Sequence, residues 1–222
     1  NLVSNTGVVA TDTTGVGTVR RDLKAARYGS DKAIFGYGYT GAAVSMTNLV
    51  SSTGVVATDT TGVGTARYSP SATGYGGDKA IFGYGTTGAV VSMTNLVSNT
   101  GVVATDTTGV GTARNGLAAA GYGSDKAIFG YGNASGTYVS VTNLVSNTGV
   151  VATDTTGVGT ARWSLAAAGY GTDKAIFGYG LDNTTTHVSM TNLVSNTGVV
   201  ATDTTGVGTA RRELDAAGYS TS

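Results

Sequence analysis

Five aspartates and five arginines recur at fixed places in this sequence, and they are the first candidates for chemistry. The aspartates are Asp12, Asp59, Asp106, Asp154 and Asp203, and the arginines are Arg20, Arg67, Arg114, Arg162 and Arg211. A hard cation needs several oxygen ligands in one place, but each aspartate stands alone in a Thr-Asp-Thr-Thr-Gly segment. We therefore predict that the aspartates form turns by bonding their own backbone. The arginines are predicted to pack between repeats and to bond strand-end carbonyls. Because the aspartates stand alone, no metal site is predicted.

Catalytic groups are sparse. His187 is the only histidine, the chain has no cysteine, and Asp182 is the only carboxylate near that histidine in sequence. This set predicts neither a zinc site nor an acid–base pair. No serine stands in a nucleophile-elbow context, and the Gly-Tyr-Gly and Gly-Val-Gly segments precede no helix that could bind phosphate. The sequence thus predicts a protein that is not an enzyme and needs no cofactor.

The residues that differ between otherwise similar repeats are the best candidates for binding. Differences fall in two places: the loops 39–43, 86–90, 133–138 and 181–187, and the two residues after each repeated arginine. In an up-down meander both connections lie on the same face, where a rigid scaffold usually presents binding loops. The candidate binding residues are Tyr39, Tyr68, Tyr138, Trp163, Asp182, Asn183 and His187. Neutral drift of surface loops is the alternative explanation.

A long internal repeat must position these residues. The segment NLVSNTGVVATDTTGVGTAR, or a close variant, begins at residues 1, 48, 95, 143 and 192, at intervals of 47 to 49 residues. A period of this size is typical of one supersecondary unit that buries its apolar face against its neighbours. We therefore predict one domain over residues 1–222.

Each repeat is predicted to hold four short strands. In KAIFGYG, Ala80, Phe82 and Tyr84 alternate with Ile81 and glycines, and the glycine side would let another sheet approach closely. VSMTNLV and VVATDTT follow as further strands, and LAAAGYG precedes them at 117–123 and 165–171. The 36 glycines and single proline suit tight turns between strands. Four antiparallel strands per repeat predict an all-β protein built from β-propeller blades.

Counting the copies predicts how the ring closes. NLVSNTG or its variant occurs five times but DKAIFGYG only four times, and a further inner strand is expected at Leu214–Tyr219. We favour a five-bladed β-propeller of four-stranded antiparallel blades, closed by pairing of the N- and C-terminal strands. Its last blade would lack one strand, and its free edges would allow self-association or recruitment of a strand from a partner. Four blades with overhanging ends is the competing geometry.

The repeat resembles two groups of proteins. The order LAAAGYG, DKAIFGYG, VSMTNLVSNTGVV resembles a kelch repeat, although Gly36 and Gly38 are separated by Tyr37 and the only tryptophan is Trp163. The segments DKAIFGYG and TDTTGVGTAR also resemble repeat proteins of marine and cyanobacterial phages that are virion structural or tail-associated. These resemblances imply a kelch-like propeller with a structural or attachment role, located on a virion or outside cells.

The charge balance limits the choice of partner. The chain has 13 basic and 13 acidic residues and a net charge of zero, so nucleic acid is not an expected partner. No apolar run approaches ~20 residues, so membrane insertion is not expected, and the first residues lack the blocks of a signal peptide. Three hypotheses remain: a structural or attachment module that binds a protein or surface glycan, a glycan-binding lectin-like propeller, and an engineered symmetric scaffold without a ligand.

Overall fold

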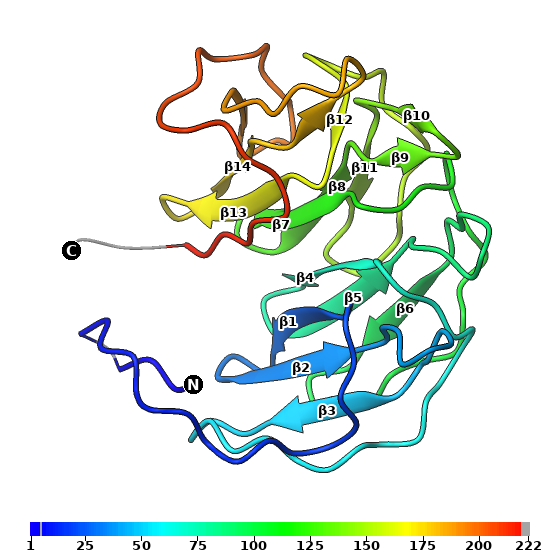
Figure 1. Ribbon diagram of the computed structural model, residues 1–222, viewed down its shortest axis with the longest axis vertical. Coiled ribbons are helices and arrows are strands. Elements are labelled where there is room, and N and C mark those ends of the chain that lie inside the picture. The colour runs from blue at the N-terminus through cyan, green and yellow to red at the C-terminus, as the bar shows by residue number, and fades with distance from the viewer. Residues whose placement is uncertain (5, 219–222) are drawn as a thin grey trace.

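The computed structural model describes residues 1–4 and 6–218, and these residues form an all-β structure without α-helices (Figure 1). Four antiparallel sheets have three strands each, two smaller ones have two strands, and none closes into a barrel. The three-stranded sheets comprise β1 (Lys24–Tyr28), β2 (Lys32–Gly36) and β3 (Thr47–Val50); β4 (Ser71–Tyr75), β5 (Lys79–Gly83) and β6 (Thr94–Val97); β7 (Ala118–Tyr122), β8 (Lys126–Gly130) and β11 (Thr142–Val145); and β13 (Ala166–Tyr170), β14 (Lys174–Gly178) and β16 (Thr191–Val194). The two-stranded sheets pair β9 (Asn133–Ala134) with β10 (Thr137–Tyr138) and β12 (Arg162–Trp163) with β15 (Leu181–Asp182).

In each of the four three-stranded sheets the first three predicted strands are confirmed, and the KAIFG strand is the middle one. In the first sheet Phe35 lies opposite Ala25 on β1 and Asn48 on β3. The predicted fourth strand is wrong as a continuous strand, because the chain meets the third strand only at isolated bridges such as Val50 with Val56. Between these bridges the backbone leaves the ladder, and the side chain of Asp59 bonds a loop of the preceding repeat instead.

The four sheets follow one another around a central axis, with the two chain ends on the same side of the molecule (Figure 1). Their first strands, β1, β4, β7 and β13, are successive neighbours around a central cavity of about 940 Å³. Residues 215–218 also line this cavity, and Asp215 forms an ion pair of 3.2 Å with Lys24 on β1. The C-terminal inner segment thus reaches the first sheet.

The inner strand expected at Leu214–Tyr219 is wrong for its described part, since residues 214–218 pair with no strand; Tyr219 lies outside the described residues. The corresponding strands of the other repeats each pair with a KAIFG strand, and the fifth inner segment has no such neighbour. The physical reason for the difference is therefore the absence of a hydrogen-bonding partner.

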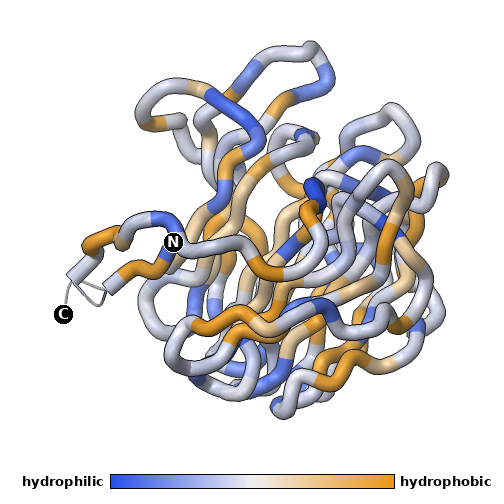
Figure 2. Tube along the Cα trace, turned by 60° about the horizontal axis from the view of Figure 1, so that its bottom comes forward, coloured by the Kyte–Doolittle hydropathy of each residue, from blue (hydrophilic) through white to orange (hydrophobic). Residues whose placement is uncertain are grey.

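Neighbouring sheets pack by inserting a phenylalanine against a glycine, which confirms the predicted role of the glycine side. A Cβ atom on Gly36 would lie 2.7 Å from Cζ of Phe82, and the Phe82 ring meets Tyr37 edge-on at 5.2 Å between centroids. The same packing joins Phe129 to Gly83 and Phe177 to Gly130. Fully burying one phenylalanine contributes roughly 1.5–3 kcal/mol. Figure 2 shows hydrophobic stretches recurring along the packed strands.

Candidate recognition surface

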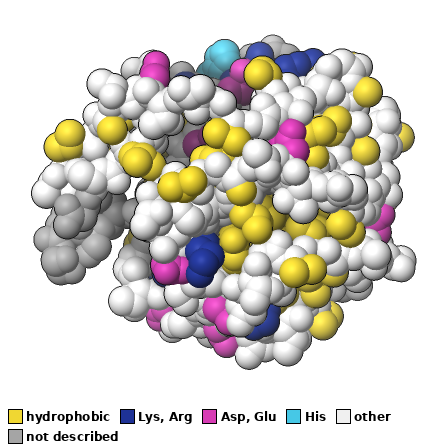
Figure 3. All heavy atoms as spheres, turned by 90° about the horizontal axis from the view of Figure 1, so that it is seen from below, with side chains coloured by type: hydrophobic (Ala, Val, Ile, Leu, Met, Phe, Trp, Pro, Cys, Tyr) yellow, Lys and Arg dark blue, Asp and Glu magenta, His cyan; other side chains and the backbone are white. Residues whose placement is uncertain are grey.

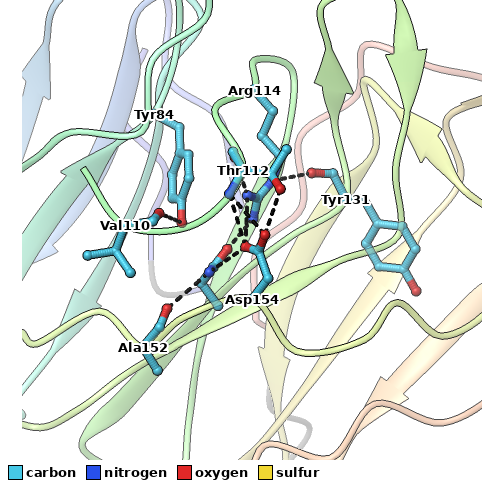
Figure 4. A network of polar contacts seen from close by, with 8 residues as sticks. Tyr84, Val110, Thr112, Arg114, Tyr131, Ala152 and Asp154 are labelled. Atoms are coloured by element: carbon cyan, nitrogen blue, oxygen red, sulfur yellow. Dashed lines mark hydrogen bonds and ion pairs between the residues drawn. The ribbon is translucent and has the colours of Figure 1, made fainter.

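The repeated arginines lie in the seams between sheets, as the sequence predicts. At the seam between the second and third sheets, Arg114 is fully buried and donates through Nη2 to Oδ1 of Asn143 at 2.6 Å (Figure 4). Its Nε donates to the carbonyl oxygen of Tyr131 at 2.7 Å, and its guanidinium lies 4.3 Å from the ring centroid of Tyr84 in the preceding sheet. Arg114 therefore connects two repeats with its charge, its donors and its planar face.

The repeated aspartates complete the same seams, and their predicted role as self-bonded turn residues is wrong. Asp154 accepts hydrogen bonds from Oγ1 of Thr112 at 2.6 Å and from Nδ2 of Asn143 at 2.9 Å (Figure 4). Thr112 belongs to the loop that arrives from the preceding repeat, so the carboxylate bonds across the seam. Burial works to raise the pKa of Asp154, but the hydrogen bonds from Thr112 and Asn143 lower it overall.

The tyrosine of Gly-Tyr-Gly is the third part of each seam. Tyr84 has φ of +63°, uncommon for a bulky residue, and this turn places its fully buried ring under Arg114. Its hydroxyl donates to the carbonyl oxygen of Val110 at 3.2 Å. Burial raises the pKa of Tyr84 to about 12, with Arg114 acting in the opposite direction.

Most polar groups of these seams bond one another, which joins the repeats, although Nε of Arg67 and of Arg162 has no partner among the described residues. Asp154 lies 4.0 Å from Nη1 of Arg114, and both groups have several further partners. Within residues 1–4 and 6–218, no three side chains from histidine, cysteine, aspartate and glutamate cluster as a metal site would require. The residues left over for recognition are those of the variable loops.

The two variable places of the sequence meet in space. The residue that follows each of the first three repeated arginines bridges to the variable loop of its own sheet: Arg21 to Tyr39, Tyr68 to Thr86 and Asn115 to Asn133. In the fourth sheet β12 pairs with β15, which joins Trp163 to Leu181. In these four sheets the two kinds of variable connection lie side by side, and together these loops are called the variable surface below.

Aromatic side chains pair across neighbouring sheets on the variable surface. Tyr39 and Tyr68 meet edge-on with ring centroids 5.1 Å apart, and Tyr138 and Trp163 meet in a tilted arrangement at 5.7 Å. The Arg21 guanidinium lies 4.7 Å from the Tyr39 centroid, and that of Arg212 lies 5.6 Å from the Trp163 ring. Four of the seven candidate residues therefore form two aromatic pairs, each bordered by an arginine.

The other three candidate residues have different positions. Asp182 holds its own loop by accepting from the amide and hydroxyl of Thr184, and hydrogen bonds from Thr184 lower its pKa. Asn183 accepts from the amide of Tyr138 at 3.0 Å and so links two neighbouring loops. His187 bridges to Leu181, the residue that pairs with Trp163, and it lines a shallow pocket of about 360 Å³ together with Asp203.

Sequence reasoning missed two polar atoms beside Trp163. Nε1 of Trp163 and Oδ1 of Asn115 are buried, and neither has a hydrogen-bond partner in the part of the chain that the structure describes. The six-membered ring of Trp163 lies against Gly116, the residue next to Asn115. Asn115 follows a repeated arginine, so its variable position was the only sequence signal, and nothing in the sequence showed that its amide would lack a partner.

The variable surface surrounds a hollow at one end of the central cavity. The backbone amide of Ser69 donates to the carbonyl oxygen of Asp22, and the backbone amide of Glu213 donates to the carbonyl oxygen of Ser164. With Leu117 and neighbouring residues, these segments line a hollow of about 260 Å³. All five arginine-to-inner-strand connections reach its rim, so a ligand centred here could contact several repeats at once.

No protein-family model matches the chain, and no curated protein sequence matches it. Among the described residues, no helix is long and apolar enough to span a bilayer. The functional argument therefore depends on the geometry of the variable surface.

Proposed function

We propose that this protein is a non-enzymatic, five-bladed propeller-like module that attaches to a protein or surface glycan through its variable surface. The observation that carries the proposal is the pairing of variable aromatic residues on a framework that otherwise repeats. Tyr39 with Tyr68, and Tyr138 with Trp163, combine residues from different repeats, so they depend on how neighbouring sheets sit together. Large aromatic side chains bordered by arginine are frequent anchors of binding surfaces.

The fivefold arrangement is supported by the segments at the two chain ends. The first residues form a hairpin in which Val3 bridges to Val9, as Val50 bridges to Val56 in the first sheet. Residues 215–218 line the central cavity together with β1, β4, β7 and β13. These two segments would be the outer and inner parts of a fifth blade.

A virion or extracellular setting is part of the same proposal and comes from the resemblance to phage repeat proteins. A rigid platform with exchangeable loops suits attachment, because the loops vary while the seams stay constant. Its gene is expected to lie beside tail or virion genes. A genomic neighbourhood without any virion gene would contradict the phage setting while leaving the binding role to be tested separately.

Binding to cell surfaces tests the attachment role. The fluorescently labelled chain is incubated with a panel of intact marine bacteria and cyanobacteria, beside a variant in which Tyr39, Tyr68, Tyr138 and Trp163 are all alanine. We expect adherence to at least one strain and its loss in the variant. The matched control is Val199→Asp, at an exposed position outside the variable surface. Equal adherence of the wild type and the aromatic variant would contradict the role of the aromatic pairs.

A glycan ligand is the second candidate function, and the surroundings of Trp163 favour it. The indole N–H of Trp163 and the amide oxygen of Asn115 are buried without partners beside two aromatic rings, so a sugar would reach this donor and acceptor after the Trp163 ring moves. Sugars present hydroxyl groups and apolar faces that suit such a combination, and weak sites on several repeats would add by avidity. On a glycan array, Trp163→Phe should weaken binding by removing the indole N–H donor and reducing the aromatic face. Absence of binding to every glycan on the array would refute this candidate.

A further inference from the structure

One side of the molecule has an open seam where two sheets lack a neighbour. The Tyr179 ring is only half-buried and has no phenylalanine against it, whereas Tyr37, Tyr84 and Tyr131 are fully buried. Arg211 stacks on Tyr179 at 4.3 Å, yet it is exposed in the described structure. At the first sheet, Phe35 is half-buried, while its counterparts Phe82, Phe129 and Phe177 are fully buried.

The rest of a fifth blade already stands beside this opening. Asn1 donates to Oδ1 of Asp12 at 2.7 Å, as Asn48 does to Asp59 in the first sheet. Leu2 lies against Gly54 in the way that Leu49 lies against Gly101. The N-terminal hairpin is therefore docked on the first sheet as its neighbours dock on one another.

On the inner side, Gly218 lies beside the carbonyl oxygen of Gly169 on β13, and Asp215 pairs with Lys24 on β1. Residues 215–218 thus occupy the inner place between the last and first sheets. Only the middle place of this blade, which KAIFG strands occupy in the other four sheets, is not filled by the described residues.

The hairpin exposes apolar side chains that this middle strand would cover. Val3 is 64% exposed, whereas Val97, Val145 and Val194 at the equivalent positions are 0% exposed. A hollow of about 620 Å³ lies between the hairpin and the first sheet and is lined by Leu2, Val16 and Phe35. Figure 2 shows hydrophobic stretches in the hairpin at the N-terminus, and Figure 3 shows hydrophobic side chains gathered in patches on the side of β3.

We infer that this opening is an acceptor site for one extended polypeptide strand with the sequence pattern Asp-Lys-Ala-Ile-Phe-Gly-Tyr-Gly. The occupant is a further copy of the repeat's middle strand carried by another polypeptide segment, since this pattern fills the same place in all four sheets. Its backbone would pair with residues 1–3 on one edge and with 215–218 on the other, which is β-strand addition between two edges. The inference rests on the fivefold arrangement proposed above but not on any ligand of the variable surface.

The existing seams specify the contacts that the strand would make. Its phenylalanine would lie against Gly178 and Tyr179, as Phe177 lies against Gly130 and Tyr131. Its tyrosine ring would lie under Arg20, as Tyr37 lies under Arg67. The same ring would also cover Phe35. These contacts would cover Tyr179 and Phe35, which are half-buried without them.

A second copy of this chain is a poorer occupant than a free strand. Each of its four KAIFG strands is already bonded on both edges, and donating one would leave a sheet without its middle strand. A free strand needs no such disruption. The proposed occupant is therefore a strand from a polypeptide in which this segment is not already hydrogen-bonded on both edges.

A peptide-binding experiment tests the inference. The full chain is titrated with a fluorescein-labelled peptide of the sequence 78–85, DKAIFGYG, and anisotropy is measured. We expect saturable binding, at least tenfold weaker for the peptide with Phe82→Ala. On the chain, Val3→Asp should weaken binding at least tenfold, and Val199→Asp, at a similarly exposed valine, should leave it unchanged.

The remaining outcomes separate this site from the variable surface and from self-association. Trp163→Ala should leave peptide binding intact, because Trp163 belongs to the variable surface. Loss of glycan or cell binding would therefore not be accompanied by loss of peptide binding. Binding that is absent, or that does not depend on Phe82 and Val3, would overturn the inference. Light scattering that shows a dimer blocking the peptide would overturn it in favour of a second copy as the occupant.

Discussion

The three complete seams and the open seam contain the same residues in different surroundings. Arg114 stacks on Tyr84 and is fully buried between two sheets. Arg211 stacks on the equivalent tyrosine, Tyr179, but is exposed. The Thr112 loop bonds Asp154 of the next repeat. For the C-terminal copy of this loop, which contains Thr209, the aspartate at the corresponding position is Asp12 in the N-terminal segment. Near-identical repeats therefore differ in stability according to the neighbour they have.

This comparison points to the seam, rather than the single sheet, as the main place where large side chains are buried. A three-stranded sheet with strands of four or five residues buries little by itself, but each seam buries a phenylalanine, a tyrosine and an arginine together. Repeat proteins of this kind gain stability mainly from nearest-neighbour interfaces. Replacing equivalent residues at complete and open seams is thus a direct way to separate the interface from the repeat.

The largest difference is expected for the arginines. Arg114→Ala should lower the free energy of unfolding by about 3–5 kcal/mol, because it leaves Asn143, Asp154 and the carbonyl of Tyr131 without their buried partner. The matched variant Arg211→Ala should cost no more than ~0.5 kcal/mol, since that side chain is exposed. Urea denaturation of both variants measures the difference, and equal losses would contradict the seam account.

A smaller difference is expected for the glycines that accept a phenylalanine. Gly130→Ala should destabilise the protein by about 1–3 kcal/mol, because the new Cβ would lie 2.7 Å from Cζ of Phe177. At Gly178 the nearest atom to a new Cβ is Cγ2 of Thr191 at 3.2 Å, so Gly178→Ala should cost less. Thermal unfolding midpoints should rank the two variants in this order; the reverse order would show that the phenylalanine contact does not govern these positions.

A further effect is expected at alkaline pH. Burial raises the pKa of Tyr37, Tyr84 and Tyr131 to about 12, above the ordinary value of 10.0 that applies in the unfolded chain. Their contribution to stability is therefore complete below pH 10 and is lost as pH rises toward 12. Absorbance at 295 nm should show these tyrosines ionising together with unfolding. Tyr84→Phe should reduce the pH-dependent loss of stability; an unchanged loss would contradict the role of this residue.

The sequence predicted the framework better than the contacts that join it. Alternation in KAIFGYG identified the middle strand, and its glycines identified the face where the next sheet packs. The partner of Asp154 could not be predicted, because Thr112 precedes it by 42 residues and belongs to the loop of another repeat. The up-down topology likewise predicted the variable loops on one face, but only three-dimensional packing brings Tyr138 of one repeat to Trp163 of the next.

The central claim is that identical loop residues are protected only where the next repeat is in place. Backbone amide hydrogen exchange at the repeated loop threonine tests it most directly, because the Thr112 amide donates to Asp154 at 3.0 Å and the amides of Thr65 and Thr160 have equivalent acceptors. We predict slow exchange at these three amides and at least tenfold faster exchange at Thr209, which has no carboxylate acceptor among the described residues. Exchange at Thr209 as slow as at Thr112, without any added strand, would contradict the account.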